Sequence, residues 1–415
     1  MSRPDPHALA AAAALAERLA DPPAVRAAGG GEGGGRRRGQ SLAGGAAGIA
    51  LLHIERARCG HGGWPTAHAW LSAAARDELS AGPNAGLYFG APTLAFLTHT
   101  AADRPGKLTR ALATLDASTA AVTRRRLDEA HARIDRGDRP ALAEFDLIRG
   151  LAGLGAYHLQ HNPHHDIITA AVLFYLVRLT EPLAGRTDRL PGWWTDLAPT
   201  GRPSPDYPAG HGNSGMSHGI AGPLALLSLA LRRGVVVKGH ADAIGRICTW
   251  LDAWQQEHRC GPWWPGIITL ENVHKGHVQQ SSRQRPSWCY GTPGLARAQQ
   301  LAGLATGDTV RQRTAQTAML GCLRDPEQLA RIVDSGLCHG MAGLLQTAWR
   351  MAADTHTPDI AAELPRLAAR LLTQHRCAPE DTEFLDGHAG VALALHTAGT
   401  GTAPLAHWDA CLLLT

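Results

Sequence analysis

The stretch Arg285-Pro286-Ser287-Trp288-Cys289-Tyr290-Gly291-Thr292-Pro293-Gly294-Leu295-Ala296 places a cysteine beside a Gly-x-x-Gly step that opens an apolar run. The arrangement recurs downstream as Leu337-Cys338-His339-Gly340-Met341-Ala342-Gly343 and upstream as Ser217-His218-Gly219-Ile220-Ala221-Gly222. Each copy carries a metal-competent or acid–base side chain just ahead of its first glycine. A fold that brings these steps to a common centre would also gather Cys289, Cys338, His339 and His218.

The step is a repeat that runs through the whole chain. Seven copies begin at residues 45, 90, 150, 219, 291, 340 and 387. The residues after each step are mainly Ala and Leu, and Gly222–Leu231 is apolar nearly all round, as in a fully buried helix. Segments between the steps, such as Ile360–Leu372, are amphipathic. The predicted fold class is therefore all-α: an α/α toroid of about seven inner and seven outer helices, with residues 1–415 as a single domain.

Some segments depart from the repeat. Ala8–Ala28 predicts a helix that breaks at two prolines near its end, and Gly29–Gln40 predicts a flexible loop. Thr98–Glu144 is interpreted as an insertion after the second repeat, with an exposed Arg-rich helix at Val122–Arg139. Leu190–Ser214, rich in Pro, Gly and Trp, is too long for a plain connector, so we expect an irregular rim or lid there.

Composition limits the classes of function. The 415-residue chain has a formal net charge of +4, which gives no electrostatic case for a nucleic-acid partner. Its eight cysteines are scattered, as in a reduced cytosolic protein. The sequence has neither a signal-peptide pattern at its N-terminus nor an apolar run of transmembrane length. We therefore expect a cytoplasmic protein with no transmembrane segment.

Cys289, Cys338 and His339 offer two thiolates and one imidazole. This set suits a catalytic Zn²⁺ site, in which three protein ligands leave one position open. The alternative is that both cysteines are small buried residues and that His339 caps a helix. Zinc deprotonates a coordinating thiol, so an open position could bind a substrate thiol as a nucleophile. This favours transfer or addition chemistry on sulfur, although hydrolysis remains an alternative.

Three further residues are candidates for acid–base and anion chemistry. His218 shares the repeat slot of the metal-competent residues, which favours a general acid–base role over a capping histidine. Asp146, four residues before the third step, is predicted to orient His218, and a helix cap is the alternative. Arg285 is predicted to stabilise an anion, unless it is an ordinary surface arginine. Cys59-Gly60-His61 and Asp386-Gly387-His388 have no further ligands nearby in the sequence, and we interpret both as structural.

At these residues the chain resembles the lanthipeptide cyclases, the LanC family, and the resemblance runs from Gly45 to Leu395. It is carried by the seven steps and by three motifs: Ser217-His218-Gly219, Trp288-Cys289-Tyr290-Gly291 and Cys338-His339-Gly340. It implies an α/α toroid with one zinc ion per chain, held by Cys289, Cys338 and His339. It also implies His218 and Asp146 as the acid–base pair and Arg285 as the active-site arginine.

Two features depart from the family pattern. Thr93 stands where the second glycine of the second step would be, which concerns packing rather than chemistry. The 98–144 insertion occupies the place where one member of the family carries a small SH2-like domain. Because this segment is short and helical in character, we do not expect a complete domain there.

The reaction that the resemblance implies is an intramolecular Michael-type addition. A precursor-peptide cysteine attacks dehydroalanine or dehydrobutyrine as a thiolate and forms a lanthionine or methyllanthionine ring. The implied partners are the dehydrated precursor peptide with its leader, a separate dehydratase and an exporter, in a complex that would hold this cytoplasmic enzyme at the membrane periphery. The alternatives are a relative that binds glutathione or adds it to dehydroamino acids, and a non-catalytic scaffold in a modification complex.

Overall fold

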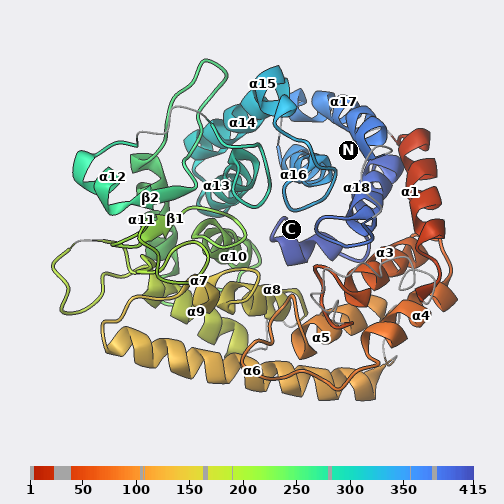
Figure 1. The fold of residues 1–415 in the computed structure, drawn as a ribbon, viewed down its shortest axis with the longest axis horizontal. Coiled ribbons are helices and arrows are strands. Elements are labelled where there is room, and N and C mark those ends of the chain that lie inside the picture. Colours follow the sequence, from red (N-terminus) through yellow and green to blue (C-terminus); the bar gives the residue numbers. More distant parts are fainter. Residues whose placement is uncertain are drawn as a thin grey trace. The chain divides into compact units, whose positions relative to one another are not determined.

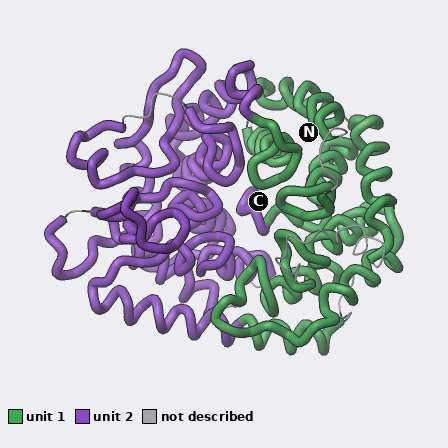
Figure 2. Tube along the Cα trace, in the orientation of Figure 1, with its two compact units in different colours: residues 1–119, 332–410, 415 green, residues 120–331, 411–414 purple. Residues whose placement is uncertain are grey.

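The computed structural model describes residues 4–22, 39–102, 106, 108–161, 167–188, 190–278, 283–355, 357–375 and 381–415. The chain divides into two compact units, coloured in Figure 2. Unit 1 comprises residues 1–119, 332–410 and 415, and unit 2 comprises residues 120–331 and 411–414. The loop predicted at Gly29–Gln40 lies outside the described residues except for its last two. A single domain over residues 1–415, with an insertion at 98–144, stays a prediction.

A helix begins within two residues of the first glycine of each of the seven steps. In unit 1 these buried helices are α3 (Ala46–Arg58), α5 (Ala91–Ala101), α16 (Met341–Ala353) and α18 (His388–Thr400). Their amphipathic partners are α1 (Pro6–Arg18), α4 (Trp64–Ala74) and α17 (Asp359–Gln374). As Figure 1 shows, α3 packs on α4, α16 on α17 and α18 on α1, while α18 also contacts both α3 and α16. The predicted alternation of buried and outer helices is confirmed within this unit.

Unit 2 repeats the arrangement. Its buried helices are α8 (Leu151–His161), α10 (Ala221–Arg232) and α13 (Thr292–Thr306), and their partners are α9 (Ile167–Leu179), α11 (His240–Ala253) and α14 (Thr309–Arg324). Helix α10 contacts both α8 and α13. Nearly every residue of α10 is buried, as its continuous apolar run predicts.

The remaining elements are mostly short. They are α7 (Leu142–Phe145), α12 (Leu270–Lys275), α15 (Pro326–Ala330), the 3₁₀ helix η2 (Trp408–Leu412), and strand β1 (His211–Asn213), which pairs antiparallel with β2 (Ile267–Thr269). The long helix α6 (Thr109–Asp135) begins earlier than the helix predicted at Val122–Arg139. Among the described residues, no helix is both long and apolar enough to cross a membrane.

Helix α1 ends before the proline pair at which the predicted helix Ala8–Ala28 is expected to break, and residues 23–28 of that prediction lie outside the described residues. The side chain of Asp5 accepts the N–H groups of His7 and Ala8, and a proline stands in the first turn, so the helix has a well-formed start. It ends at Arg18, several residues ahead of the proline pair. A residue before proline disfavours the helical conformation, which accounts for an end upstream of Pro22.

The loop at Leu190–Ser214 is irregular apart from β1, as predicted. Its two tryptophans are buried, and the ring of Trp193 meets that of Trp250 on α11 edge-on, with centroids 6.0 Å apart. The indole N–H of Trp194 donates to the carbonyl oxygen of Ala209 over 2.9 Å. The loop is therefore anchored to unit 2 by its aromatic side chains, and its role as a lid stays a prediction.

Close backbone contacts require both glycines of a step. A Cβ built on Gly340 would lie 2.4 Å from the backbone nitrogen of Gly336, and one on Gly343 would lie 1.9 Å from the carbonyl oxygen of Leu337. The turn that carries Cys289 shows the same two contacts. Only a residue without a side chain lets the first turn of the helix approach the preceding turn so closely.

Thr93, which replaces the second glycine of the second step, uses the same carbonyl position differently. Its Oγ1 donates a hydrogen bond to the carbonyl oxygen of Leu87 over 2.8 Å. Leu87 lies six residues earlier, as Leu337 does relative to Gly343. Where a glycine avoids a clash with this carbonyl oxygen, the threonine hydroxyl bonds to it instead. The departure at Thr93 is therefore a matter of packing, as the sequence predicts.

Gly343→Ala is expected to lower the stability of the chain by about 1–3 kcal/mol or more, because the new methyl group overlaps a backbone carbonyl. Gly245→Ala is the matched control, since Gly245 lies within α11 and a Cβ there meets nothing within 4 Å. Replacing a glycine inside a helix by alanine should raise stability by roughly 0.5–1 kcal/mol. Thermal unfolding of both variants checks the prediction, and equal effects of the two changes would contradict it.

Candidate functional site

The Gly-rich turns of unit 2 are hydrogen-bonded to one another. The N–H of Leu147 donates to the carbonyl oxygen of Ser217 over 3.1 Å. The N–H groups of Met216 and Ser217 both donate to the carbonyl oxygen of Cys289, over 2.8 and 3.3 Å. The turns that precede α8, α10 and α13 therefore form one row, and their side chains start from neighbouring backbone positions.

The row brings together the predicted acid–base pair. His218 Nδ1 lies 2.6 Å from Asp146 Oδ2. The Asp146 side chain is fully buried, whereas that of His218 is 28% exposed. Asp146 Oδ1 accepts the N–H groups of Arg149 and Gly150, over 2.6 and 2.8 Å, at the start of α8. Asp146 thus closes the turn that precedes α8 and also contacts His218, and its role in orienting His218 stays a prediction.

Cys289 lies on the next turn of the row and is buried. Its thiol donates to Ser287 Oγ over 3.5 Å, and the same oxygen accepts the N–H groups of Tyr290 and Gly291. The ring of Tyr290 is tilted by 30° against that of His218, with centroids 6.3 Å apart. The cysteine and the histidine are therefore carried by adjacent turns that also meet through Tyr290.

Arg285 opens the turn that carries Cys289. Its backbone carbonyl accepts the N–H of Ser287 over 2.8 Å, which closes the chain tightly at this point. The residue is half-buried. Its predicted role in stabilising an anion stays a prediction.

Cys338 and His339 belong to unit 1, where the turns also bond to one another. The N–H groups of Leu337 and Cys338 donate to the carbonyl oxygen of Leu385, over 2.6 and 2.9 Å. The Nε2 atom of His339 lies 3.5 Å from a carboxylate oxygen of Asp334, and its Nδ1 atom lies 3.6 Å from one of Asp386. Both ring nitrogens therefore have a carboxylate close by.

The sequence interpretation assigned Asp386-Gly387-His388 a structural role only, and it did not single out Asp334. The structure places both carboxylates beside His339. The signal for Asp386 was present, because it stands directly before the first glycine of a step, in the slot that His218 and His339 also occupy. Asp334 carries no such signal in the sequence.

The donor chemistry of these residues fits a zinc ion. Two thiols and an imidazole are ligands that zinc accepts, and a ligating imidazole commonly has a carboxylate partner for its other nitrogen. Asp334 and Asp386 provide such a partner whichever nitrogen of His339 binds. Cys289 belongs to unit 2, so a single ion shared by Cys289, Cys338 and His339 stays a prediction.

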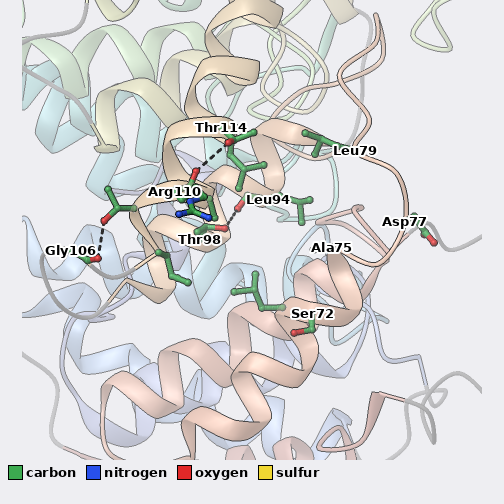
Figure 3. Close-up of a pocket in the computed structure, with 14 residues that line it drawn as sticks. Ser72, Ala75, Asp77, Leu79, Leu94, Thr98, Gly106, Arg110 and Thr114 are labelled. Carbon is green, nitrogen blue, oxygen red and sulfur yellow. Dashed lines mark hydrogen bonds between the residues drawn. The ribbon is translucent and has the colours of Figure 1, made fainter.

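A cavity of about 940 Å³ lies in unit 1, between the end of α4, the middle of α5 and the first turns of α6 (Figure 3). Its lining is mainly apolar, and none of the predicted site residues contributes to it. The hydroxyls of Thr98 and Thr114 donate within their own helices, to the carbonyl oxygens of Leu94 and Arg110. The residues lining this cavity therefore show no catalytic arrangement.

Comparisons with known proteins agree with this geometry. The solved structure of a nisin cyclase matches 96% of this chain and 96% of its own, with a TM-score of 0.79 at 19% identity, which confirms the predicted all-α, α/α-toroid fold class. The nisin biosynthesis protein NisC of Lactococcus lactis subsp. lactis is 23% identical over 256 residues. That alignment covers 61% of this chain and spans 60% of the length of NisC. The family described as lanthionine synthetase C-like protein matches residues 37–413, and this chain therefore belongs to that family.

Proposed function

We propose that this chain is a zinc-dependent lanthipeptide cyclase. It joins a cysteine of a precursor peptide to a dehydroalanine or dehydrobutyrine of the same peptide, forming a lanthionine or methyllanthionine ring. Membership of the lanthionine synthetase C-like family supports this reaction, as do the similarities to a nisin biosynthesis protein and a nisin cyclase. The observation that carries the proposal is the 2.6 Å contact between His218 Nδ1 and Asp146 Oδ2. The turn that carries His218 is hydrogen-bonded to the turn that carries Cys289.

In this proposal Cys289, Cys338 and His339 hold one zinc ion per chain. Three protein ligands leave one position for the sulfur of the precursor cysteine. The bound metal would lower the pKa of the incoming thiol, so that the sulfur reacts as a thiolate near neutral pH. Whichever of Asp334 and Asp386 faces the nitrogen that does not bind the metal would keep the ring of His339 in its ligating orientation.

His218 carries the proton between the two reacting groups. Its Nδ1–H donates to Asp146, which leaves the lone pair on Nε2. Nε2 accepts the proton that leaves the precursor thiol and returns it to the α-carbon once sulfur has bonded to the β-carbon. The buried carboxylate of Asp146 stabilises the imidazolium in between. The S–H bond and the π bond between the α- and β-carbons break while one S–C and one C–H bond form, so the mass of the peptide is unchanged.

Arg285 is proposed to stabilise the charge of the enolate. After sulfur adds to the β-carbon, negative charge develops on the carbonyl oxygen of the dehydroamino acid. A guanidinium is permanently charged and donates two parallel hydrogen bonds, which suits this oxygen. Arg285 begins the turn that carries Cys289, so the two residues are only four positions apart in the chain.

The proposed reaction defines the partners. The substrate is a dehydrated precursor peptide with its leader, and the dehydroamino acids have to be made beforehand by a separate dehydratase. An exporter would receive the finished product. A complex of these proteins would hold the cyclase in the cytoplasm, at the periphery of the membrane.

Incubation of the purified, zinc-loaded chain with a dehydrated precursor peptide tests the proposal. The expected result is a peptide of unchanged mass whose cysteines no longer react with an alkylating reagent. A parallel incubation with glutathione separates the rival function: a glutathione adduct without ring formation would favour a glutathione-adding protein. No change in either incubation would favour a non-catalytic scaffold.

A further inference from the structure

Three potential metal ligands meet in unit 1, and none of them is among the residues proposed for catalysis. Glu55 lies on α3, Cys59 caps the C-terminus of the same helix, and His396 lies on α18. One ligand atom from each residue lies within 4.8 Å of the others. Glu55 and Cys59 are four residues apart and so share one face of the helix end. We call these three residues the α3–α18 cluster.

The buried ring of His396 lacks a hydrogen-bond partner in the part of the chain that the structure describes, which suggests that it binds something else. Its residue is 1% exposed, and neither ring nitrogen has a hydrogen-bond partner among the described residues. A buried polar group without a partner is costly, so native proteins rarely retain one. His53 on α3 is similarly buried, but its Nε2 bonds to the carbonyl oxygen of Leu19 over 2.9 Å. Burial, together with the charge of Arg56, lowers the pKa of His396 to about 4, which leaves the imidazole neutral and able to ligate.

Glu55 and Cys59 would supply the negative charge of a metal site, Cys59 once a cation has displaced its thiol proton. The thiol of Cys59 donates to Glu55 Oε1 over 3.1 Å. The two oxygens of Glu55 also accept the N–H groups of Leu405 and Ala406, over 3.1 and 2.7 Å. A carboxylate has about four lone-pair sites, so these bonds leave room for a metal. Burial and the neighbouring carboxylate raise the pKa of Cys59 to about 12, so this sulfur stays protonated until a cation replaces its proton.

The end of α3 orients the cluster and connects it to solvent. Gly60 has a φ of +73°, and the N–H groups of Gly60 and His61 donate to the carbonyl oxygens of Ala57 and Arg56. This is a Schellman motif, which reverses the chain directly after Cys59. His61 is exposed, and its ring meets that of His396 edge-on with centroids 5.3 Å apart. The cluster can therefore be reached from the surface beside His61.

We propose that Glu55, Cys59 and His396 form a second zinc site, which holds α3 and α18 together. Thiolate and imidazole donors favour zinc over magnesium or calcium, and small rotations would bring the three atoms to bonds of about 2.0–2.3 Å. Binding replaces the thiol proton of Cys59, which leaves to solvent. The two negative ligands then balance the two positive charges of the ion. Such an ion ties α3 to α18 and, through Glu55, to the segment at Leu405 and Ala406.

A comparable group in unit 2 lacks these features. His258, Cys260 and Asp325 also offer ligand atoms within 4.8 Å of one another. Asp325, however, is paired with the guanidinium of Arg283 and caps α15 through the N–H of Glu327. A positive charge already neutralises its carboxylate, so this group attracts a cation less than the α3–α18 cluster does.

Metal content measured in the Cys338→Ala variant separates the second site from the first. The full-length chain, equilibrated with buffered zinc and freed of excess metal, should retain one tightly bound ion in this background. Adding Cys59→Ser should remove that ion, whereas Cys248→Ser should not, because Cys248 is a buried free cysteine of α11 outside the metal-competent groups of the described residues. A Cys338→Ala chain that holds no zinc, or one whose zinc survives Cys59→Ser, would overturn the proposal. If Cys338 binds no metal at all, the loss caused by Cys59→Ser remains diagnostic.

The sign of a stability change gives an independent test. Without a metal, His396→Leu removes an unpartnered buried imidazole and should raise the melting temperature. With zinc bound, the same change removes a ligand and should lower it. We expect a lower melting temperature than wild type in zinc and a higher one after chelation. An increase under both conditions would show that no ion binds there, and an equal decrease under both would show that His396 acts through packing alone.

Discussion

Cys289→Ala and Cys338→Ala are each expected to abolish zinc binding at the proposed catalytic centre and, with it, cyclisation. A zinc ion held by three side chains loses a third of its protein ligands in either variant, and with that ligand goes one thiolate charge. The effect should exceed the roughly 10- to 100-fold losses that follow removal of a residue behind a ligand. Ring formation, followed as the loss of alkylatable thiols, should fall below detection.

The folded state should survive both changes. The thiol of Cys289 donates to Ser287 Oγ, and the backbone bonds that hold its turn do not involve the sulfur. Circular dichroism and thermal unfolding should therefore differ little from wild type. Metal analysis should show the loss of one ion and the retention of the ion assigned to the α3–α18 cluster. Cyclisation that persists in either variant would remove that cysteine from the mechanism.

His218→Ala is expected to slow cyclisation by about 10²- to 10⁴-fold while zinc stays bound, because it removes the proton carrier but none of the proposed ligands. Single-turnover rates on a dehydrated precursor, measured beside metal content, check this split. An unchanged rate would exclude His218 from proton transfer. Loss of zinc together with activity would mean that His218 supports the metal site instead.

Asp146→Asn tests how His218 is oriented. The asparagine side chain can still accept the N–H groups of Arg149 and Gly150, so the turn that precedes α8 keeps its hydrogen bonds. It cannot hold a proton on Nδ1 of His218 through a carboxylate, nor stabilise an imidazolium by charge. We expect near-normal thermal stability with a strongly reduced rate. Normal activity in this variant would show that Asp146 serves only to hold the turn before α8.

Much of the helical fold could be predicted because its signals are local. Each step pairs two glycines with an apolar run, and the glycines are required by contacts within one turn, such as that between Gly343 and Leu337. Helix ends were predicted less well: α1 stops at Arg18, since several weak local preferences compete at a terminus. The proximity of His218 and Asp146 was also predicted, because His218 stands directly before one step and Asp146 stands four residues before another, and neighbouring turns bring these positions together.

The sequence by itself determined that this chain is a helical repeat with chemistry placed just before its glycines. These helices and their glycines depend on backbone contacts between residues a few positions apart, so a short stretch of sequence is enough to predict them. Only the tertiary structure decided that His396 meets Glu55 and Cys59. Those side chains come from helices and turns distant along the chain. Their meeting depends on how α3 and α18 pack, which no local pattern in the sequence specifies.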